Sequence, residues 1–246
     1  MTIESARDVR QTRSDETAWF SAGALLIVAG LVTAVSVIRQ WSLCTVGGWS
    51  SQACVTLQQT MNVLPIQADT LALRAPWAAP LAALGLTLAT VAWIAFLILS
   101  RLSRGIKIFG AVVAVPLVIM SLGGWFGAWS VESWVAHGGA WIVIGVIAEF
   151  VAIGFLVYAT MSREPVDRVT TQRLIVLLFG VTAFGTMHQS AEFILFGLPA
   201  QSASGVPRYL GFGTALTLVL TGAGVIGMTI WARKKPPRAH DVSIMG

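Results

Sequence analysis

The feature that most constrains this chain is a series of six apolar runs, each long enough to cross a lipid bilayer as a helix. A bilayer core of about 30 Å needs about 20 helical residues, because an α-helix rises about 1.5 Å per residue. An apolar fraction of 56% and a charged fraction of 11% are typical of membrane proteins rather than of soluble domains. We therefore predict an all-α integral membrane protein, a bundle of six transmembrane helices. The expected spans are Trp19–Ile38, Trp77–Leu99, Ile106–Gly127, Trp141–Thr160, Leu174–Leu198 and Leu210–Trp231.

The first apolar run follows three arginines and so loosely resembles a signal peptide. Its apolar core is longer than the usual ~7–15 residues, acidic residues are mixed into the preceding segment, and no A-x-A cleavage site follows. We therefore expect this run to be a retained membrane helix.

The distribution of lysine and arginine predicts the orientation of the chain, because basic residues near helix ends are retained in the cytoplasm. With the amino terminus inside, thirteen of the sixteen basic residues lie in inner segments and three in outer segments. This bias predicts a protein of the cytoplasmic membrane with both termini cytoplasmic. Its parts are an N-terminal segment (residues 1–18), a six-span domain (19–231) and a C-terminal tail (232–246). The basic residues form no continuous stripe, so the expected partner is the lipid bilayer and not nucleic acid.

The longest polar connection, residues 39–76, is expected to be external and contains the only two cysteines, Cys44 and Cys54. An oxidising compartment and a short intervening segment predict a structural disulfide between them. The alternative is a redox-active pair, which usually has closer C-x-x-C spacing and, in membrane thiol oxidases, a second pair to relay electrons. Nine residues intervene here, and there is no second pair.

The fifth run contains GTMHQSAEF, residues 185–193, with a histidine and a glutamate four positions apart. Ionisable residues within a bilayer cost about 3 kcal/mol or more and are rare. His188, Gln189 and Glu192 share one helical face, and the fourth run contains Glu149. Counted from the expected outer ends, Glu149 lies about 12 Å deep and His188 about 15 Å deep. We therefore expect these two side chains to lie within hydrogen-bonding distance of each other.

Two interpretations of these polar residues stay open. In the first, they form an outward-opening intramembrane site with two further residues at its mouth. In the second, they only tie helices together, or Glu192 reaches the headgroups. The expected site residues are Glu149, His188, Gln189 and Glu192, with Glu132 and His137 at the mouth.

Other motifs give little support for a cofactor or a metal. No zinc-binding or nucleophile motif is present, and His137 is expected at the membrane edge, away from His188, which disfavours a bis-histidine haem. The sequence GAGVIG, residues 222–227, lies within the last span and lacks the preceding strand of a dinucleotide site. Small residues at four-residue spacing predict close helix packing, within the chain, with a membrane-protein partner or with a second copy. They are Gly211, Ala215, Ala223 and Gly227.

Three functions remain open from the sequence. The first is a non-catalytic membrane subunit or accessory protein, in agreement with the short loops and the missing catalytic motifs. The second is a small proton-coupled transporter that uses Glu149 and His188. The third is a membrane enzyme that acts on a lipid-linked substrate from the outer side, with a carboxylate and an imidazole as acid and base.

Overall fold

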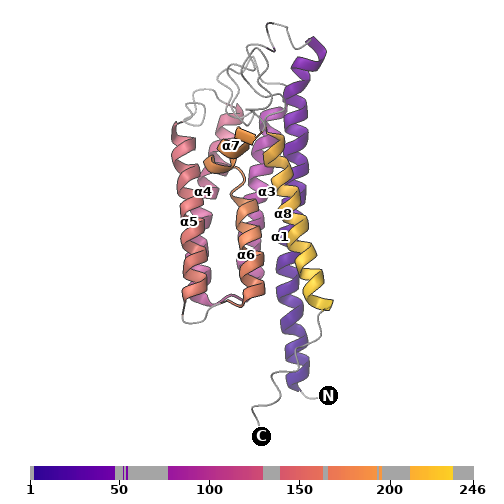
Figure 1. Ribbon diagram of the computed structural model, residues 1–246, viewed down its shortest axis with the longest axis vertical. Coiled ribbons are helices and arrows are strands. Elements are labelled where there is room, and N and C mark those ends of the chain that lie inside the picture. The colour runs from indigo at the N-terminus through magenta and orange to yellow at the C-terminus, as the bar shows by residue number, and fades with distance from the viewer. Residues whose placement is uncertain are drawn as a thin grey trace.

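The computed structural model describes residues 3–47, 52, 54, 77–129, 139–162, 166–192, 194–195 and 211–234. All regular structure in these residues is helical. The helices form an elongated bundle, in which the start of α1 and the end of α8 lie at the same end (Figure 1). Their bounds are α1 Ile3–Gly47, α3 Ala78–Leu99, α4 Arg104–Trp129, α5 Gly139–Met161, α6 Arg168–Val181, α7 Thr186–Glu192 and α8 Phe212–Lys234.

The composition of these helices is that of a multi-pass membrane protein. Within the described residues, five helices are long and apolar enough to cross a bilayer, and α6 with α7 forms a sixth candidate if the bent pair is counted as one span. The apolar side chains face outward as well as inward: Phe150 and Ile153 of α5, for example, are 59% and 51% exposed. A helix that is hydrophobic on all sides needs a lipid or protein environment on its outer face.

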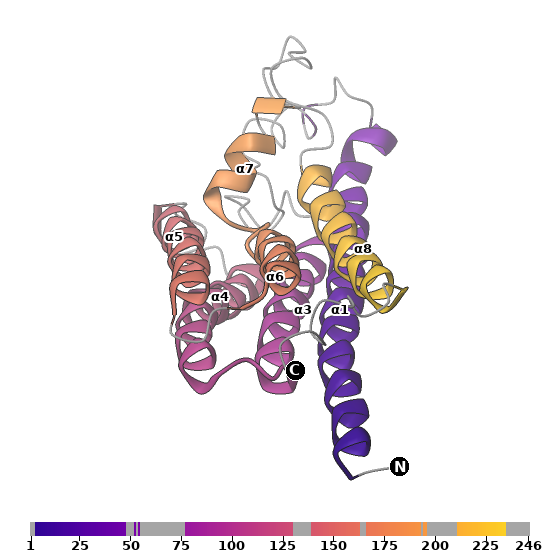
Figure 2. The ribbon, with the colours of Figure 1, turned by 60° about the horizontal axis from the view of Figure 1, so that its bottom comes forward.

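The helices are arranged with α1 between α3 and α8, and with α4 and α5 beyond α3 (Figure 2). The short helix α6 contacts α8, α3 and α5, so it is central to one side of the bundle. This arrangement places the end of α6, the whole of α7 and the start of α8 next to one another.

Glycines allow the backbones of α1 and α8 to approach closely. A Cβ atom on Gly30 would lie 2.7 Å from the carbonyl oxygen of Ala215, and one on Gly23 would lie 2.8 Å from that of Gly222. Small residues permit such contacts between membrane helices. Ala215 and its helix therefore pack within the chain, whereas a Cβ atom on Gly227 would meet no atom within 4 Å.

The first helix is longer than expected from the sequence. The apolar span within α1 covers Asp15–Ser42, and the helix includes residues of both the expected N-terminal segment and the expected external loop. After Gly30 no glycine or proline occurs before Gly47, so nothing in the sequence favours an earlier end. The bounds of α3, α4, α5 and α8 agree with the expected spans to within three residues.

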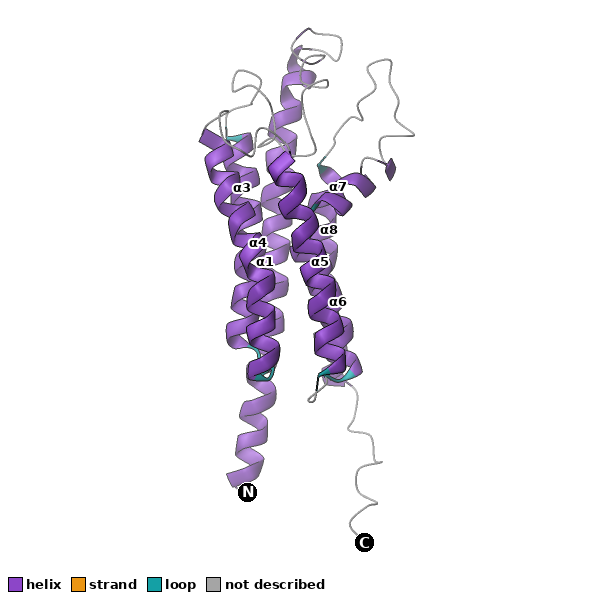
Figure 3. Cartoon of the chain, turned by 90° about the vertical axis from the view of Figure 1, so that its left-hand side faces the viewer, coloured by secondary structure: helices purple, strands orange, loops and turns teal. Residues whose placement is uncertain are grey.

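The prediction of one continuous helix over Leu174–Leu198 was wrong. The helix α6 ends at Val181, α7 begins at Thr186, and the two are bent by 76°. Figure 3 shows α7 lying across the direction of α6. The physical reason is found in the polar contacts around residues 182–186, which form the candidate site.

Candidate functional site at the broken helix pair

The start of α6 is fixed by an ordinary N-cap. The Asp167 carboxylate accepts hydrogen bonds from the backbone N–H of Val169 (2.8 Å) and Thr170 (3.0 Å), and from the Thr170 hydroxyl (2.6 Å). Burial raises the pKa of Asp167, but these hydrogen bonds and the nearby Arg173 guanidinium outweigh it and hold the pKa below its ordinary value of 3.8. The ionised carboxylate is thus the form that this helix end prefers.

The end of α6 is a series of tight turns. The N–H of Ala183 donates to the carbonyl of Gly180 (3.0 Å), and the N–H of Gly185 donates to that of Thr182 (2.7 Å). The Thr182 hydroxyl donates to the carbonyl of Leu178 at 2.8 Å. Main-chain groups within a membrane protein must find partners inside the protein, so a break of this kind needs such local bonds.

Glu149 of α5 supplies the partners for the start of α7. Its carboxylate accepts from the N–H of Met187, at 2.9 and 3.1 Å to its two oxygens, and from the N–H of His188 at 3.3 Å. The side chain is 5% exposed. Glu149 therefore acts as an N-terminal cap provided by a neighbouring helix, which offsets the cost of burying the carboxylate.

The approach of α5 to the break depends on the absence of side chains at two glycines. A Cβ atom on Gly185 would lie 2.5 Å from Oε1 of Glu149, and one on Gly145 would lie 2.6 Å from the Thr186 hydroxyl. That hydroxyl donates to the carbonyl of Ile142 at 2.9 Å, which adds a second tie between α5 and α7. The two glycines let the chains come close enough for both contacts.

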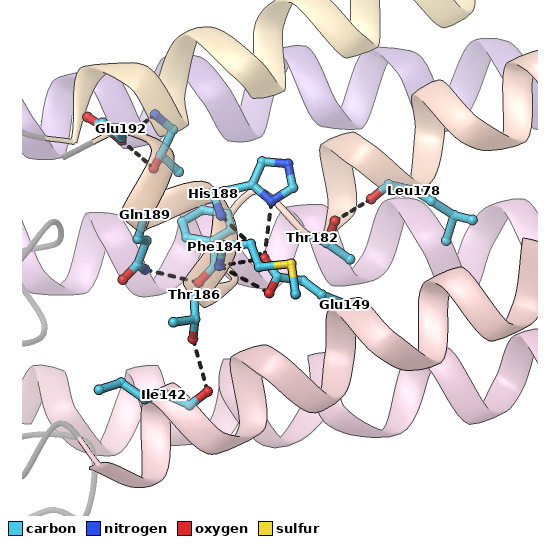
Figure 4. A network of polar contacts seen from close by, with 11 residues as sticks. Ile142, Glu149, Leu178, Thr182, Phe184, Thr186, His188, Gln189 and Glu192 are labelled. Atoms are coloured by element: carbon cyan, nitrogen blue, oxygen red, sulfur yellow. Dashed lines mark hydrogen bonds and ion pairs between the residues drawn. The ribbon is translucent and has the colours of Figure 1, made fainter. Parts of the chain in front are cut away.

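The expected contact between Glu149 and His188 is present. The Nδ1 atom of His188 lies 3.3 Å from Oε1 of Glu149, and the two side chains point toward each other from α7 and α5 (Figure 4). The imidazole also lies against the Phe179 ring, with centroids 4.3 Å apart. Its other nitrogen, Nε2, is buried and has no hydrogen-bond partner among the described residues.

The structure does not bring Glu192 into this group. Its carboxylate accepts from the N–H groups of Gly211 (2.5 Å), Gly213 (2.9 Å) and Thr214 (2.8 Å), and from the Thr214 hydroxyl (2.9 Å). Glu192 is 4% exposed and caps the start of α8. Contrary to the interpretation in which Glu192 reaches the headgroups, its carboxylate is directed inward, because these N–H groups hold it within the protein.

Gln189 also takes part in the break rather than in an open site. Its Nε2 atom donates to the carbonyl of Phe184 at 3.0 Å, and Figure 4 shows the side chain directed away from His188. The other expected residues, Glu132 and His137, lie outside the described residues.

Two cavities meet at the imidazole of His188. The larger has a volume of about 390 Å³ and lies between α5 and α6, with Glu149 and Thr182 among its few polar linings. The smaller, about 200 Å³, lies between the α6–α7 pair and α8. Phe179, His188 and Ala191 line both cavities. The described part of the chain contains no cluster of three metal-ligating side chains.

The roles of the threonines at the break were not predicted from the sequence. Thr186 and Gln189 fit the S/T-x-x-E/Q pattern of a helix start, which is the one sequence signal that a new helix begins there. In the structure the Thr186 hydroxyl bonds to Ile142 of α5, so the pattern marks the position without giving the partner.

The predicted disulfide between Cys44 and Cys54 is present, with the two Cα atoms 4.8 Å apart. Both side chains are fully buried. The pair lies near the end of α1 opposite its N-terminus, so it belongs to the same end of the bundle as α7 (Figure 1).

The site and fold together define a multi-pass helical membrane protein whose described residues include a broken helix pair held by buried carboxylates. No protein-family model, curated protein or solved structure matches the chain.

Proposed function

We propose that this chain is a six-span protein of the cytoplasmic membrane that serves as a non-catalytic subunit or accessory protein. The observation that carries the proposal is the use of both intramembrane carboxylates. Glu149 and Glu192 each accept several main-chain N–H groups at the start of another helix. A carboxylate held in this way would lose its partners if it moved or took up a proton, so it is poorly suited to general acid–base work.

The proposed orientation places both termini in the cytoplasm. Thirteen of the sixteen basic residues then lie in inner segments, as the positive-inside rule requires. The common location of the start of α1 and the end of α8 supports an even number of crossings. Reporter fusions after Ile66 and Ser204 should be external, and fusions after Ser103 and Arg168 internal; one reversed fusion would contradict the orientation.

The accessory role is tested by purifying the tagged chain from native membranes in a mild detergent. We expect other membrane polypeptides to accompany it at a constant ratio, and the purified chain alone to carry no proton flux in lipid vesicles. If the chain purifies without partners in several mild detergents, the accessory role is wrong.

A second candidate is a small proton-coupled transporter, and the observation that favours it is the break itself. Discontinuous helices next to ionisable residues are common at transporter sites, and here the Glu149–His188 pair adjoins the 76° bend. In that case the purified wild-type protein should give solute-dependent proton flux, and His188→Gln should abolish it without loss of fold. Glu192, which caps α8, is not part of this candidate mechanism.

A further inference from the structure

The polar network at the break leaves Nε2 of His188 without a role. The other ring nitrogen faces Glu149 at 3.3 Å, while Nε2 is buried without a partner among the described residues. Buried polar atoms are rarely left in this state, and each one calls for an explanation.

The neighbouring contacts indicate whether Nε2 is a hydrogen-bond donor or an acceptor. Oε1 of Glu149 already accepts from the main-chain N–H groups of Met187 and His188, so it acts as an acceptor and Nδ1 of the imidazole is the donor. With its proton on Nδ1, a neutral imidazole has a lone pair on Nε2. In this neutral form the missing partner is a hydrogen-bond donor.

The larger of the two cavities at the imidazole is poorly suited to holding a water as that donor. The larger cavity is lined almost entirely by carbon, from residues such as Ile153, Leu156, Ile175 and Leu178. An ordered water usually needs two to four polar partners, and such a lining does not provide them. A volume of about 390 Å³ is within the range of small-molecule sites, and a mainly apolar lining with a few polar groups is typical of them.

The Phe179 ring packs against the imidazole and lines both cavities. Its side chain is 53% exposed on the outer surface of the bundle, so it is not locked by the core. Exposed side chains change rotamer within nanoseconds. A rotation of Phe179 toward the lipid would join the cavities and uncover Nε2 for a ligand that enters from the bilayer.

We propose that Nε2 of His188 accepts a hydrogen bond from the hydroxyl group of a membrane-soluble molecule whose apolar body fills the cavity between α5 and α6. The shared chemistry is one hydroxyl donor on an apolar body, and it has two sources, an aromatic hydroquinone or an aliphatic alcohol such as a glyceride. This binding goes beyond the accessory role proposed above and does not depend on it, since the isolated chain keeps the whole cavity.

The test uses the full chain in phosphatidylcholine nanodiscs, because that lipid carries no hydroxyl donor. Only three histidines are present, so ¹⁵N-histidine labelling gives few ring signals, and His188→Gln assigns those of His188. The probes are dodecylhydroquinone, dodecan-1-ol and the dimethyl ether of the hydroquinone. We expect a hydroxyl probe to shift the Nε2 resonance of His188 and the ether to leave it unchanged.

The pattern of responses identifies the source. A response to the hydroquinone alone indicates an aromatic donor, and a response to the alcohol indicates an aliphatic one. No response to either hydroxyl probe, or an equal response to the ether, overturns the proposal.

Three variants separate hydrogen bonding from apolar filling. His188→Phe keeps an apolar ring but removes the acceptor, and we expect roughly tenfold weaker binding of the hydroxyl probe. Ile153→Trp fills the cavity, so it should abolish the Nε2 shift while the unliganded spectrum of His188 is retained. Phe179→Ala should bind the probe at least as tightly as the wild type. Full binding by both His188→Phe and Ile153→Trp, or clearly weaker binding by Phe179→Ala, would contradict the proposed site.

Discussion

Replacing Glu149 with glutamine tests whether this carboxylate holds the broken helix pair together. The change keeps the shape of the side chain but exchanges one acceptor oxygen for an NH₂ group and removes the charge. Oε1 would remain to accept from Met187 (2.9 Å) and His188 (3.3 Å), whereas an NH₂ group in place of Oε2 would face the N–H of Met187 at 3.1 Å. Two donors would then oppose each other in a buried position.

The expected magnitude follows from the hydrogen bonds that the substitution weakens or removes. Hydrogen bonds to a charged group contribute about 1.5–3 kcal/mol and neutral ones about 0.5–1.5 kcal/mol, so removing the charge and one acceptor should cost roughly 2 kcal/mol. For a chain of this size, that corresponds to a melting temperature lower by about 4–8 °C.

Thermal unfolding in a mild detergent measures the effect, and Glu16→Gln is the matched control. Glu16 forms an ion pair with Arg233 between α1 and α8, but this pair is partly exposed, and surface pairs contribute only about 0–1 kcal/mol. If Glu149→Gln melts at the temperature of the wild type, or no lower than Glu16→Gln, the carboxylate does not hold α7 in place. In combination with His188→Gln, the double variant should be destabilised by less than the sum of the two single effects.

Three further predictions concern the α8 cap, the α6 cap and the disulfide. Gly213→Ala would place a Cβ atom 2.7 Å from Cδ of Glu192 and should lower stability by about 1–3 kcal/mol. The control Gly227→Ala has open space and should be neutral or slightly stabilising. Equal melting temperatures of the two variants would argue against the α8 cap. Because its pKa is lowered in the folded state, Asp167 contributes stability above its ordinary pKa of 3.8, and this contribution is lost as the pH falls through the lowered value. The free energy of unfolding should therefore change less with pH between about pH 5 and pH 3 in Asp167→Asn than in the wild type. Removal of the disulfide by Cys44→Ser should cost about 2–3 kcal/mol in the same assay, and a protein unchanged by the substitution would show that the link is dispensable.

Much of the fold could be predicted from hydropathy because a span of about 20 apolar residues has few other uses. The ends of α3, α4, α5 and α8 were found in this way. The contact of Glu149 with His188 was also predicted, from the depth of each residue and the cost of leaving either group unpaired.

The break after Val181 could not be predicted by the same reasoning. Residues 182–186 are apolar or small and continue the hydropathy of the run. Hydropathy averaged along the sequence therefore predicts one helix. Local hydrogen bonds close the end of α6, whereas α7 is held in its bent direction by partners distant in sequence, above all Glu149 and the carbonyl of Ile142. Sequence periodicity carries no information about such contacts, because they depend on how α5 is placed beside α7.

Because of the break, Glu149 and Glu192 lie at the starts of two different helices. On a continuous helix, His188 and Glu192 lie on one face and point to one site. With the bend, α7 reaches across to α8, and its last residue meets the N–H groups of Gly211, Gly213 and Thr214. A Cβ atom on Gly213 would lie 2.7 Å from Cδ of Glu192, so the absence of a side chain there permits this contact.

The two glutamates connect three helices in series, and this explains why ionisable residues are present in these spans. Glu149 of α5 holds the start of α7, and Glu192 at the end of α7 holds the start of α8. Isolated helices shorter than ~12 residues are marginal, so the seven-residue α7 depends on contacts at both ends. A break in a span frees main-chain N–H groups, and a buried carboxylate needs such groups, so each compensates the cost of the other. The fold thereby accounts for both carboxylates, whereas it provides no partner among the described residues for the Nε2 atom of His188.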